Sequence, residues 1–303
     1  MVDMTVTLAG VRLRNPIVAA SGAFAFGREY GEYYSLARLG ALTVKGLNME
    51  GGAGNPPPRV AETPCGMLNS VGLQNPGVAA FLRDELPYLR QYDLPVIANI
   101  YGADASGYAR AAGALADKVE LIELNISCPN VKQGGMAFGA EPDTAAEITA
   151  AAVAEAGCPV LVKLTPNTAK LAEVAKAVRQ AGAAGVSLIN TLSAMRIDTA
   201  SRRPVLRSNT GGLSGPAVLP VAVRCIHTVF RSADMPILGM GGVASGLDAA
   251  ELMLAGARAV AIGTAAFADL WAPVRVIEEL EAYCRAQGVA RVSELTGGVR
   301  LWP

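Results

Sequence analysis

Short apolar runs alternate with Ala- and Leu-rich stretches along the whole chain, and this alternation constrains the fold more than any other feature. The apolar runs are rich in β-branched residues and predict strands, whereas the longer stretches predict helices. Eight such runs are residues 17–20, 41–45, 95–100, 120–126, 159–164, 185–190, 235–240 and 258–263. Repeated strand–helix units build a parallel sheet covered by helices. Eight of them favour a closed (β/α)8 TIM barrel over an open doubly wound sheet.

Helices are expected between these strands, because several of the stretches open with Pro, Asp, Thr or Ser, which favour a helix N-terminus. The main helical stretches are residues 76–91, 104–117, 143–156, 168–181, 216–230 and 245–256. Residues 5–9 and 11–13, joined by Ala9 and Gly10, predict a short N-terminal hairpin. No second pattern marks another domain, so residues 1–303 are expected to form a single barrel domain.

Two connections are too long for simple turns. Residues 46–75 are rich in Gly and Pro, and residues 191–214 carry four arginines within 196–207. Long connections in compact domains are usually lids or binding loops, so both are expected to be active-site loops. The arginines predict a solvated loop rather than a nucleic-acid patch, because no aromatic residues interleave with them.

Composition narrows the class of protein. A chain of 303 residues that is 51% hydrophobic and 17% charged is able to bury a large core. Basic and acidic residues both number 26, so no net field recruits nucleic acid or an anionic membrane. The N-terminus lacks a basic segment followed by an apolar run, and no apolar run approaches the roughly 20 residues of a membrane span. These features predict a soluble cytoplasmic protein.

The cysteines form no metal or disulfide pattern. They are odd in number and scattered, without a C-x-x-C pair, at Cys65, Cys128, Cys158, Cys225 and Cys284. Cys158, Cys225 and Cys284 are interpreted as buried structural thiols. Cys65, in the loop TPCGMLN, is a candidate for a place near the site. The single histidine, His227, is expected in the middle of a helix without a special role.

Polar residues and glycines gather where the predicted strands end. They are Ser21, Lys45, Asn99, Asn125 with Cys128, Lys163, Asn190 with Thr191, Gly241 with Gly242, and Gly263 with Thr264. Each one alone is compatible with an ordinary loop residue. In a TIM barrel, however, all these strand ends open on one face, which is the face that carries active sites. Together they predict the active site.

The two glycine sites, at Gly241 and Gly263, follow the seventh and eighth strands, where TIM barrels usually bind phosphate. No G-x-G-x-x-G fingerprint follows the first strand, so NAD is not expected to bind in the Rossmann manner. A phosphate site with two lysines at strand ends suits a phosphorylated planar cofactor such as FMN. Lys45 or Lys163 would stabilise negative charge near the flavin N1 and O2 on reduction.

Several ordered motifs carry a family resemblance over nearly the whole chain. They are NPPPR (55–59), GMLNSVGLQNPG (66–77), NISCPNVKQGG (125–135), VKLTPN (162–167), INTL (189–192), GGLSGP (211–216) and MGGV (240–243). The chain resembles the soluble class 1 dihydroorotate dehydrogenases, and within them most closely the class 1B catalytic subunit. The segment 49–53 departs from the family pattern, with Gly51 and Gly52 in place of an expected Pro-Arg.

The resemblance implies residue roles. FMN would contact Ser21, Lys45, Gly46, Asn99, Asn125, Lys163, Ile189, Gly215, Gly241, Gly242, Gly263 and Thr264. Dihydroorotate would be held by Lys45, Asn69, Ser70, Val71, Gly72, Leu73, Asn125, Asn190 and Thr191. Cys128 falls on the catalytic base, which would take a proton from C5 of dihydroorotate while a hydride leaves C6 for the flavin. A metal is not expected.

The resemblance also implies an assembly. The partner of the 1B catalytic subunit is a second chain that carries FAD and a 2Fe–2S cluster and passes electrons to NAD. A homodimer of catalytic subunits would join two such chains in a heterotetramer. Three alternatives stay open: a class 1A enzyme that uses fumarate, a flavin barrel that reduces pyrimidine bases, and a barrel that binds a phosphorylated ligand without redox chemistry.

Overall fold

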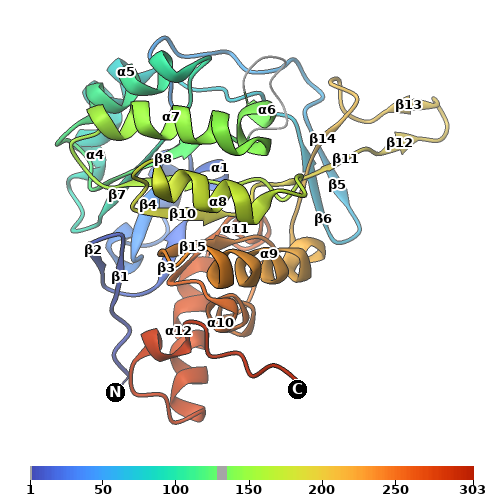
Figure 1. The fold of residues 1–303 in the computed structure, drawn as a ribbon. Coiled ribbons are helices and arrows are strands. Elements are labelled where there is room, and N and C mark those ends of the chain that lie inside the picture. Colours follow the sequence, from blue (N-terminus) through green and yellow to red (C-terminus); the bar gives the residue numbers. More distant parts are fainter. Residues whose placement is uncertain (1, 128–134) are drawn as a thin grey trace.

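The computed structural model describes residues 2–127 and 135–303. Eight parallel strands close into a barrel in which each strand pairs with the next, and the last pairs with the first (Figure 1). They are β3 Ile17–Ala19, β4 Ala41–Thr43, β7 Val96–Ile100, β8 Leu121–Asn125, β9 Val160–Lys163, β10 Gly185–Leu188, β15 Ile237–Met240 and β16 Ala259–Ile262. All eight predicted strands are confirmed, each slightly shorter than expected, and so is the barrel.

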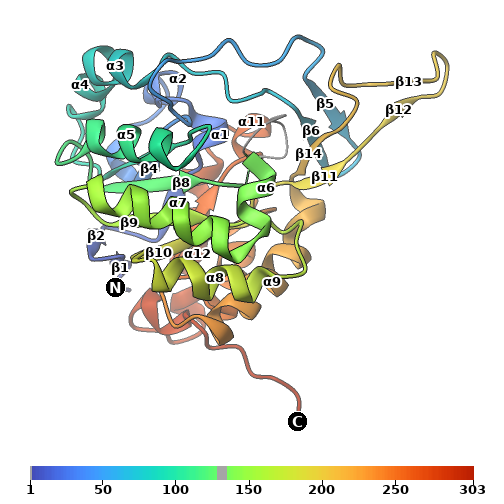
Figure 2. The ribbon, with the colours of Figure 1, turned by 45° about the horizontal axis from the view of Figure 1, so that its top comes forward.

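The longer helices surround this barrel (Figures 1 and 2). In chain order, each packs against the next: α5 Ala105–Leu115, α7 Pro142–Glu155, α8 Leu171–Gln180, α9 Leu219–Ser232, α10 Gly246–Ala255 and α12 Ala272–Ala286. Asp104 caps α5, and Ser245 with Asp248 forms a capping box at α10. These caps satisfy backbone N–H groups that a helix leaves unpaired at its start. Helix α12 was not among the predicted stretches.

The predicted helix over 76–91 consists of three pieces: α3 Val78–Ala80, a π-helical turn Phe81–Glu85 and α4 Leu86–Leu89. Pro87 follows the π turn and lacks the N–H that a regular helix would use. Shorter helices are α1 Ser21–Phe24, α2 Arg28–Gly31, α6 Gly135–Ala140 and α11 Ala265–Ala268, and 3-10 turns are Leu36–Arg38, Pro216–Val218 and Val292–Leu295. Among the described residues, no helix combines the length and the apolar character needed to cross a membrane.

The N-terminal hairpin is also confirmed. Strands β1 Val6–Leu8 and β2 Val11–Leu13 pair in antiparallel fashion. The two residues between them, Ala9 and Gly10, both have positive φ angles, as a two-residue hairpin turn requires. Leu8 and Leu13 are fully buried, so the hairpin belongs to the core.

The two long connections meet in a second sheet beside the barrel (Figure 1). Strands β5 Val60–Thr63 and β6 Gly66–Asn69 come from the first connection, and β11 Leu192–Ala194 and β14 Gly211–Ser214 come from the second. They form one antiparallel sheet in the order β11-β14-β6-β5. Strands β12 Ile197–Asp198 and β13 Arg203–Pro204 pair at the tip of an arm that extends away from the barrel. The four arginines within 196–207 lie mostly in this arm and are largely exposed, as predicted.

The barrel interior has two contrasting rows. Side chains of a strand alternate between its two faces, so residues two positions apart share a face. Asn99, Asn125 and Lys163 line a cavity at the carboxyl ends of their strands, and the inward row beneath includes Glu123 and Leu161. Below the cavity, the interior also holds buried apolar residues such as Ile97, Leu121, Leu161 and Leu238.

Candidate active site

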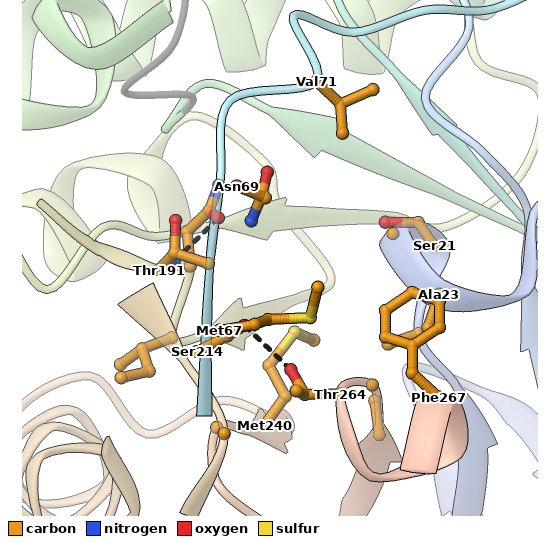
Figure 3. Close-up of a pocket in the computed structure, with 18 of the residues that line it drawn as sticks. Ser21, Ala23, Met67, Asn69, Val71, Thr191, Ser214, Met240, Thr264 and Phe267 are labelled. Carbon is orange, nitrogen blue, oxygen red and sulfur yellow. Dashed lines mark hydrogen bonds between the residues drawn. The ribbon is translucent and has the colours of Figure 1, made fainter. Parts of the chain in front are cut away.

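A cavity lies at the carboxyl ends of the barrel strands, between the barrel and the second sheet. Residues from the barrel strand ends and from both long connections line it. Met67, Asn69 and Val71 form one wall, and Ser21, Ala23 and Phe267 lie opposite them (Figure 3). The second sheet thus completes a site that the barrel alone leaves open on one side.

The predicted site residues converge on this cavity from both connections and from every strand end. Those that line it are Ser21, Lys45, Gly46, Asn69, Val71, Gly72, Leu73, Asn99, Asn125, Lys163, Ile189, Asn190, Thr191, Gly215, Gly241, Gly242, Gly263 and Thr264. Cys128 lies outside the described residues. Ser70 is not part of the lining.

Ser70 points away from the cavity because it lies between two residues that point into it. The chain is extended there, so the side chain of Ser70 takes the face opposite to Asn69 and Val71. It is only 1% exposed, and its hydroxyl accepts a hydrogen bond of 3.1 Å from Nδ2 of Asn55. The side chain of Ser70 therefore packs within the loop, and the expected part of Ser70 in substrate binding stays a prediction.

Sequence reasoning missed several lining residues. They are Ala20, Gly22, Ala23, Val60, Met67, Ser214, Pro216, Met240, Val243, Ala261, Ala265 and Phe267. Val60 and Met67 reach the cavity only through the long-range pairing of the second sheet. Met240 and Ala261 face inward near the ends of β15 and β16, a placement that strand alternation makes predictable once the inward face is known.

The glycines of the cavity wall have conformations or neighbours that exclude side chains. Gly241 and Gly242 have φ angles of 122° and 84°, and a Cβ on Gly242 would lie 2.6 Å from the backbone nitrogen of Leu219. Gly215 has a φ of 104°, and its Cβ would lie 2.5 Å from Cα of Gly66. Bare backbone therefore lines the cavity beside β14 and β15, which is the kind of surface that approaches phosphate closely.

A hydrogen bond joins the second sheet to this wall. Oγ1 of Thr264, after β16, donates to Oγ of Ser214 at the end of β14, over 2.8 Å (Figure 3). Ser214 directly precedes Gly215. The bond therefore fixes the second sheet against the barrel at the glycine corner.

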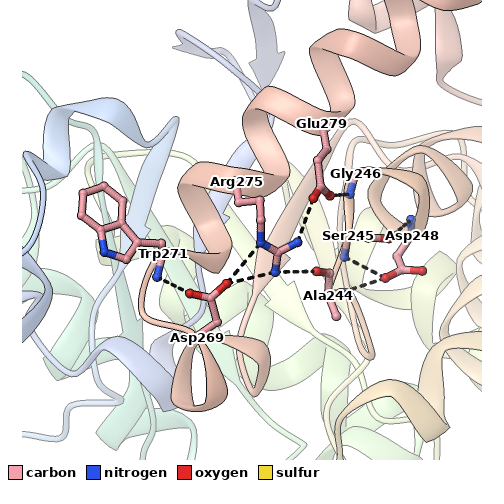
Figure 4. A network of polar contacts seen from close by, with 8 residues as sticks. All are labelled: Ala244, Ser245, Gly246, Asp248, Asp269, Trp271, Arg275 and Glu279. Carbon is pink, nitrogen blue, oxygen red and sulfur yellow. Dashed lines mark hydrogen bonds and ion pairs between the residues drawn. The ribbon is translucent and has the colours of Figure 1, made fainter.

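A polar network behind the glycine corner holds the segment that follows β15 (Figure 4). Arg275 on α12 pairs with Asp269 at 3.1 Å and with Glu279 at 2.8 Å. Glu279 accepts a bond of 2.7 Å from the backbone N–H of Gly246, and Asp248 accepts one of 2.9 Å from that of Ala244. The network anchors the start of α10, three residues beyond the cavity-lining Val243.

A charged group occupies the opposite side of the barrel. Nζ of Lys163 lies 3.8 Å from Oε2 of Glu123, and Nδ2 of Asn99 donates to the same oxygen over 2.5 Å. Lys45 also lines the cavity. Glu123 was missed in the sequence, although a signal was present: it is a charged residue inside the buried apolar run ELIELNI.

Amide side chains surround the end of β8. Nδ2 of Asn190 donates to Oγ of Ser127 over 2.9 Å, and Nδ2 of Asn167 donates to the carbonyl oxygen of Thr191 over 2.9 Å. The hydroxyl of Tyr108 donates to the carbonyl oxygen of Asn125 over 2.8 Å. The bonds from Asn190 and Tyr108 hold the end of β8 and the residues that follow it up to Ser127, which precedes Cys128 in the chain.

The described cysteines and the histidine lie outside the cavity lining. Cys225 and Cys284 are buried, as predicted, and Cys158 is half-buried, with a pKa raised to about 11 mainly by burial. Cys65 is exposed in the turn between β5 and β6, where its carbonyl oxygen accepts a bond of 3.1 Å from Ala217. His227 lies within α9, as expected.

Comparisons with known proteins agree on one family. The family model described as dihydroorotate dehydrogenase matches residues 3–284. The relatives from Anoxybacillus flavithermus and Geobacillus kaustophilus are 50% identical over 301 residues, which cover 99% of this chain and 96% of theirs. A relative from Bacillus mycoides is 49% identical and is covered over 97% of its length. All three are named dihydroorotate dehydrogenase B (NAD(+)), catalytic subunit. The family resemblance of the motifs is confirmed: the chain belongs to the dihydroorotate dehydrogenase family.

Proposed function

We propose that this chain oxidises dihydroorotate to orotate in pyrimidine biosynthesis, as the catalytic subunit of an NAD-linked dihydroorotate dehydrogenase. One observation carries the proposal: nearly all residues that the family resemblance implies for cofactor and substrate line a single cavity. Relatives of about 50% identity over the full chain bear names with this activity. The alternatives that reduce pyrimidine bases or lack redox chemistry have no specific support in the site.

FMN fits the cavity on two counts. The glycine corner at Gly215, Gly241 and Gly242 offers bare backbone to a phosphate. In the opposite wall, Oδ1 of Asn99 is buried without a hydrogen-bond partner among the described residues, which leaves it available to a ligand. Bound FMN would supply the acceptor for the two electrons of the reaction. Lys45 and Lys163 would face the negative charge that reduction creates.

Dihydroorotate would lie between the connection 69–73 and the amides at the ends of β8 and β10. Lys45 would attract its carboxylate, and Asn69, Asn125 and Asn190 would exchange hydrogen bonds with its ring amides. A kinked backbone shapes this wall, since Leu73 has a positive φ of 56°. Together these groups would orient the ring and expose its C5 proton to the base.

Cys128 would take that proton. A thiolate is a competent base, and the residue follows Ser127, whose hydroxyl accepts a hydrogen bond from the cavity-lining Asn190. The ordinary pKa of a thiol, about 8.5, implies a proton-transfer rate that increases as the pH is raised. The assignment rests on the family resemblance and on this position in the chain.

The proposed function is tested by anaerobic titration of the flavin-loaded protein. Dihydroorotate is expected to bleach the bound flavin, and dihydrouracil is expected to leave it oxidised. Bleaching by dihydrouracil alone would favour an enzyme that reduces pyrimidine bases. A protein that stays colourless after incubation with FMN would favour a barrel without redox chemistry. Chromatography of the extracted flavin should give FMN, and FAD would contradict the proposed cofactor.

Electrons would then leave through a partner subunit that carries FAD and a 2Fe–2S cluster. The phrase "catalytic subunit" in the names of the relatives supports a partner. A homodimer joined to two partner chains in a heterotetramer, in the cytoplasm, is the arrangement we propose. Purification from the native source should yield an iron-containing second chain. Rapid NAD reduction by the isolated chain would contradict the need for a partner, and rapid turnover with fumarate would indicate class 1A.

A further inference from the structure

Glu123 is a fully buried carboxylate inside the barrel, below the cavity wall. It lies on β8 two residues before Asn125, on the same inward face, and its exposure is 0%. Burying a carboxylate is costly unless it is paired and hydrogen-bonded. The role of Glu123 is therefore inferred from the residues that pair with it.

Within the described part of the chain, both polar contacts of the Glu123 side chain use one oxygen, Oε2, and both lead to residues of the cavity wall. Nδ2 of Asn99, on the neighbouring strand β7, donates to it over 2.5 Å. Nζ of Lys163, on the other neighbour β9, lies 3.8 Å away. Asn99 and Lys163 both line the cavity, so one buried carboxylate holds wall residues from the two strands that flank its own.

The bond from Asn99 decides which end of that amide is left for a ligand. Because Nδ2 is committed to Glu123, the other end, Oδ1, is a buried acceptor without a hydrogen-bond partner among the described residues. A Cβ on Gly46 would lie 2.6 Å from this Oδ1, so a glycine keeps the space beside it open. Glu123 thus fixes an acceptor at a defined place in the wall.

Glu123 also offsets the charge of Lys163. Within the described part of the chain, it is the only acidic residue that forms an ion pair with this lysine. Opposite charges interact more strongly in a buried site than in water, because solvent screens them less. The field that Lys163 exerts in the cavity is therefore weaker than that of an unpaired ammonium group.

We propose that Glu123 is a positioning residue that sets the reduction potential of bound FMN by offsetting the charge of Lys163. The inference rests on the proposed binding of FMN. Reduction by a hydride brings two electrons and one proton, so it adds one negative charge, which a nearby ammonium group stabilises. Glu123 opposes that stabilisation and keeps the potential low, as suits an enzyme whose electrons are passed to NAD. Asn99, whose side chain the same carboxylate orients, would hold FMN at a fixed position relative to this charge.

The first test compares matched Glu→Gln variants by spectroelectrochemical titration of the FMN-loaded protein. Glu123→Gln keeps the shape and removes the charge, so reduced FMN should bind about tenfold more tightly relative to oxidised FMN. That change corresponds to a midpoint potential higher by about 30 mV for two electrons. Glu120→Gln is the control, because Glu120 precedes β8 at the opposite end and pairs with Arg90 at 2.8 Å. Its potential should equal that of the wild type.

An unchanged potential in FMN-loaded Glu123→Gln overturns the inference while leaving the proposed function intact. Failure of the wild type to bind FMN would instead overturn the proposed function. A purely structural role of Glu123 predicts a lower melting temperature in Glu123→Gln without a change in potential.

A second test needs no cofactor. Melting temperatures of the FMN-free protein are compared for Glu123→Gln, Lys163→Gln and the double variant. Each single change leaves one buried charge without its partner, whereas the double variant leaves none. The double variant should therefore melt above the temperature expected from adding the two single shifts. If a single variant fails to fold, the double variant should restore folding. Strictly additive shifts, or no restoration, would contradict the pairing.

Discussion

The side chains at the two ends of the barrel interior have different roles, and strand β9 contributes one residue to each end. Leu161 near its amino end is fully buried among apolar residues, and a Cβ on Gly185 would lie 2.8 Å from its Cδ2. Lys163, two residues later on the same face, lines the cavity beside a buried carboxylate. Two positions along one strand therefore separate a packing role from a chemical one. Changes near the amino ends should alter stability, and changes at the carboxyl ends should alter chemistry.

The largest expected effect is at Cys128, which follows β8 in the chain. Cys128→Ala should leave FMN and dihydroorotate bound but slow flavin reduction by about 10²–10⁴-fold, the usual contribution of a general base. Stopped-flow reduction of the bound flavin across pH measures this. The rate of the wild type should increase with pH through an ionisation that Cys128→Ala lacks.

Cys128→Ser serves as the matched control. A hydroxyl is a much weaker acid than a thiol, so this variant should retain slight activity that appears only at high pH. Reduction of Cys128→Ala at nearly the wild-type rate would show that another group takes the proton.

The next effect concerns the apolar end of the same interior. Leu161→Ala should lower the free energy of unfolding by about 2–5 kcal/mol, because it leaves a cavity over Gly185. Leu247→Ala, at a residue 65% exposed, should stay within about 0.5 kcal/mol of the wild type. Urea unfolding measures both. Flavin reduction in folded Leu161→Ala should match the wild type, and a large loss of rate would break the proposed division between the two ends.

Sequence patterns predicted the barrel well because its strands are local, apolar and regularly spaced. The carboxyl-end position of polar residues such as Asn99 and Lys163 followed from the geometry of the fold. The second sheet was not predicted, because β6 and β14 pair over a long separation in sequence and GGLS has low strand propensity. The sequence alone could not show that the side chain of Ser70 lies outside the cavity lining, because this depends on the path of the chain between Asn69 and Val71. The catalytic role expected for Cys128 stays a prediction, because this residue lies outside the described residues.

A smaller effect is expected at the glycine corner. Gly242→Ala places a side chain at a φ of 84° and within 2.6 Å of the backbone of Leu219. The positive φ alone costs roughly 1–2 kcal/mol for a residue with a Cβ. Gly288→Ala is the control, because its φ is 69° and its Cβ would meet nothing within 4 Å. Thermal unfolding measures the cost in stability for both variants. FMN titration should show weaker FMN binding in Gly242→Ala only. Equal FMN affinity in both variants would remove the glycine corner from the phosphate site.

The smallest effect compares two cysteines at opposite ends of the molecule. Cys65 is exposed beside the second sheet, whereas Cys158 is half-buried just before β9. Burial, and secondarily the charges of Asp117 and Glu120, raise the pKa of Cys158 from about 9 to about 11. At pH 8, iodoacetamide followed by peptide mass spectrometry should therefore find Cys65 labelled first, and the labelling of Cys158 should accelerate up to about pH 11.

The same shift gives Cys158 a pH-dependent share of stability. Its folded-state pKa lies above the unfolded value, so the folded protein holds the thiol proton more tightly. This stabilisation is complete below about pH 9 and disappears as the pH rises through about 11. Cys158→Ala should lose that part of the alkaline dependence in urea unfolding at pH 8 and 10.5, while Cys65→Ala should keep it. Equal labelling of Cys65 and Cys158 at pH 8 would show that solvent reaches the amino ends of the barrel strands near Cys158. The proposed contrast between the two ends of the barrel would then not hold at this position.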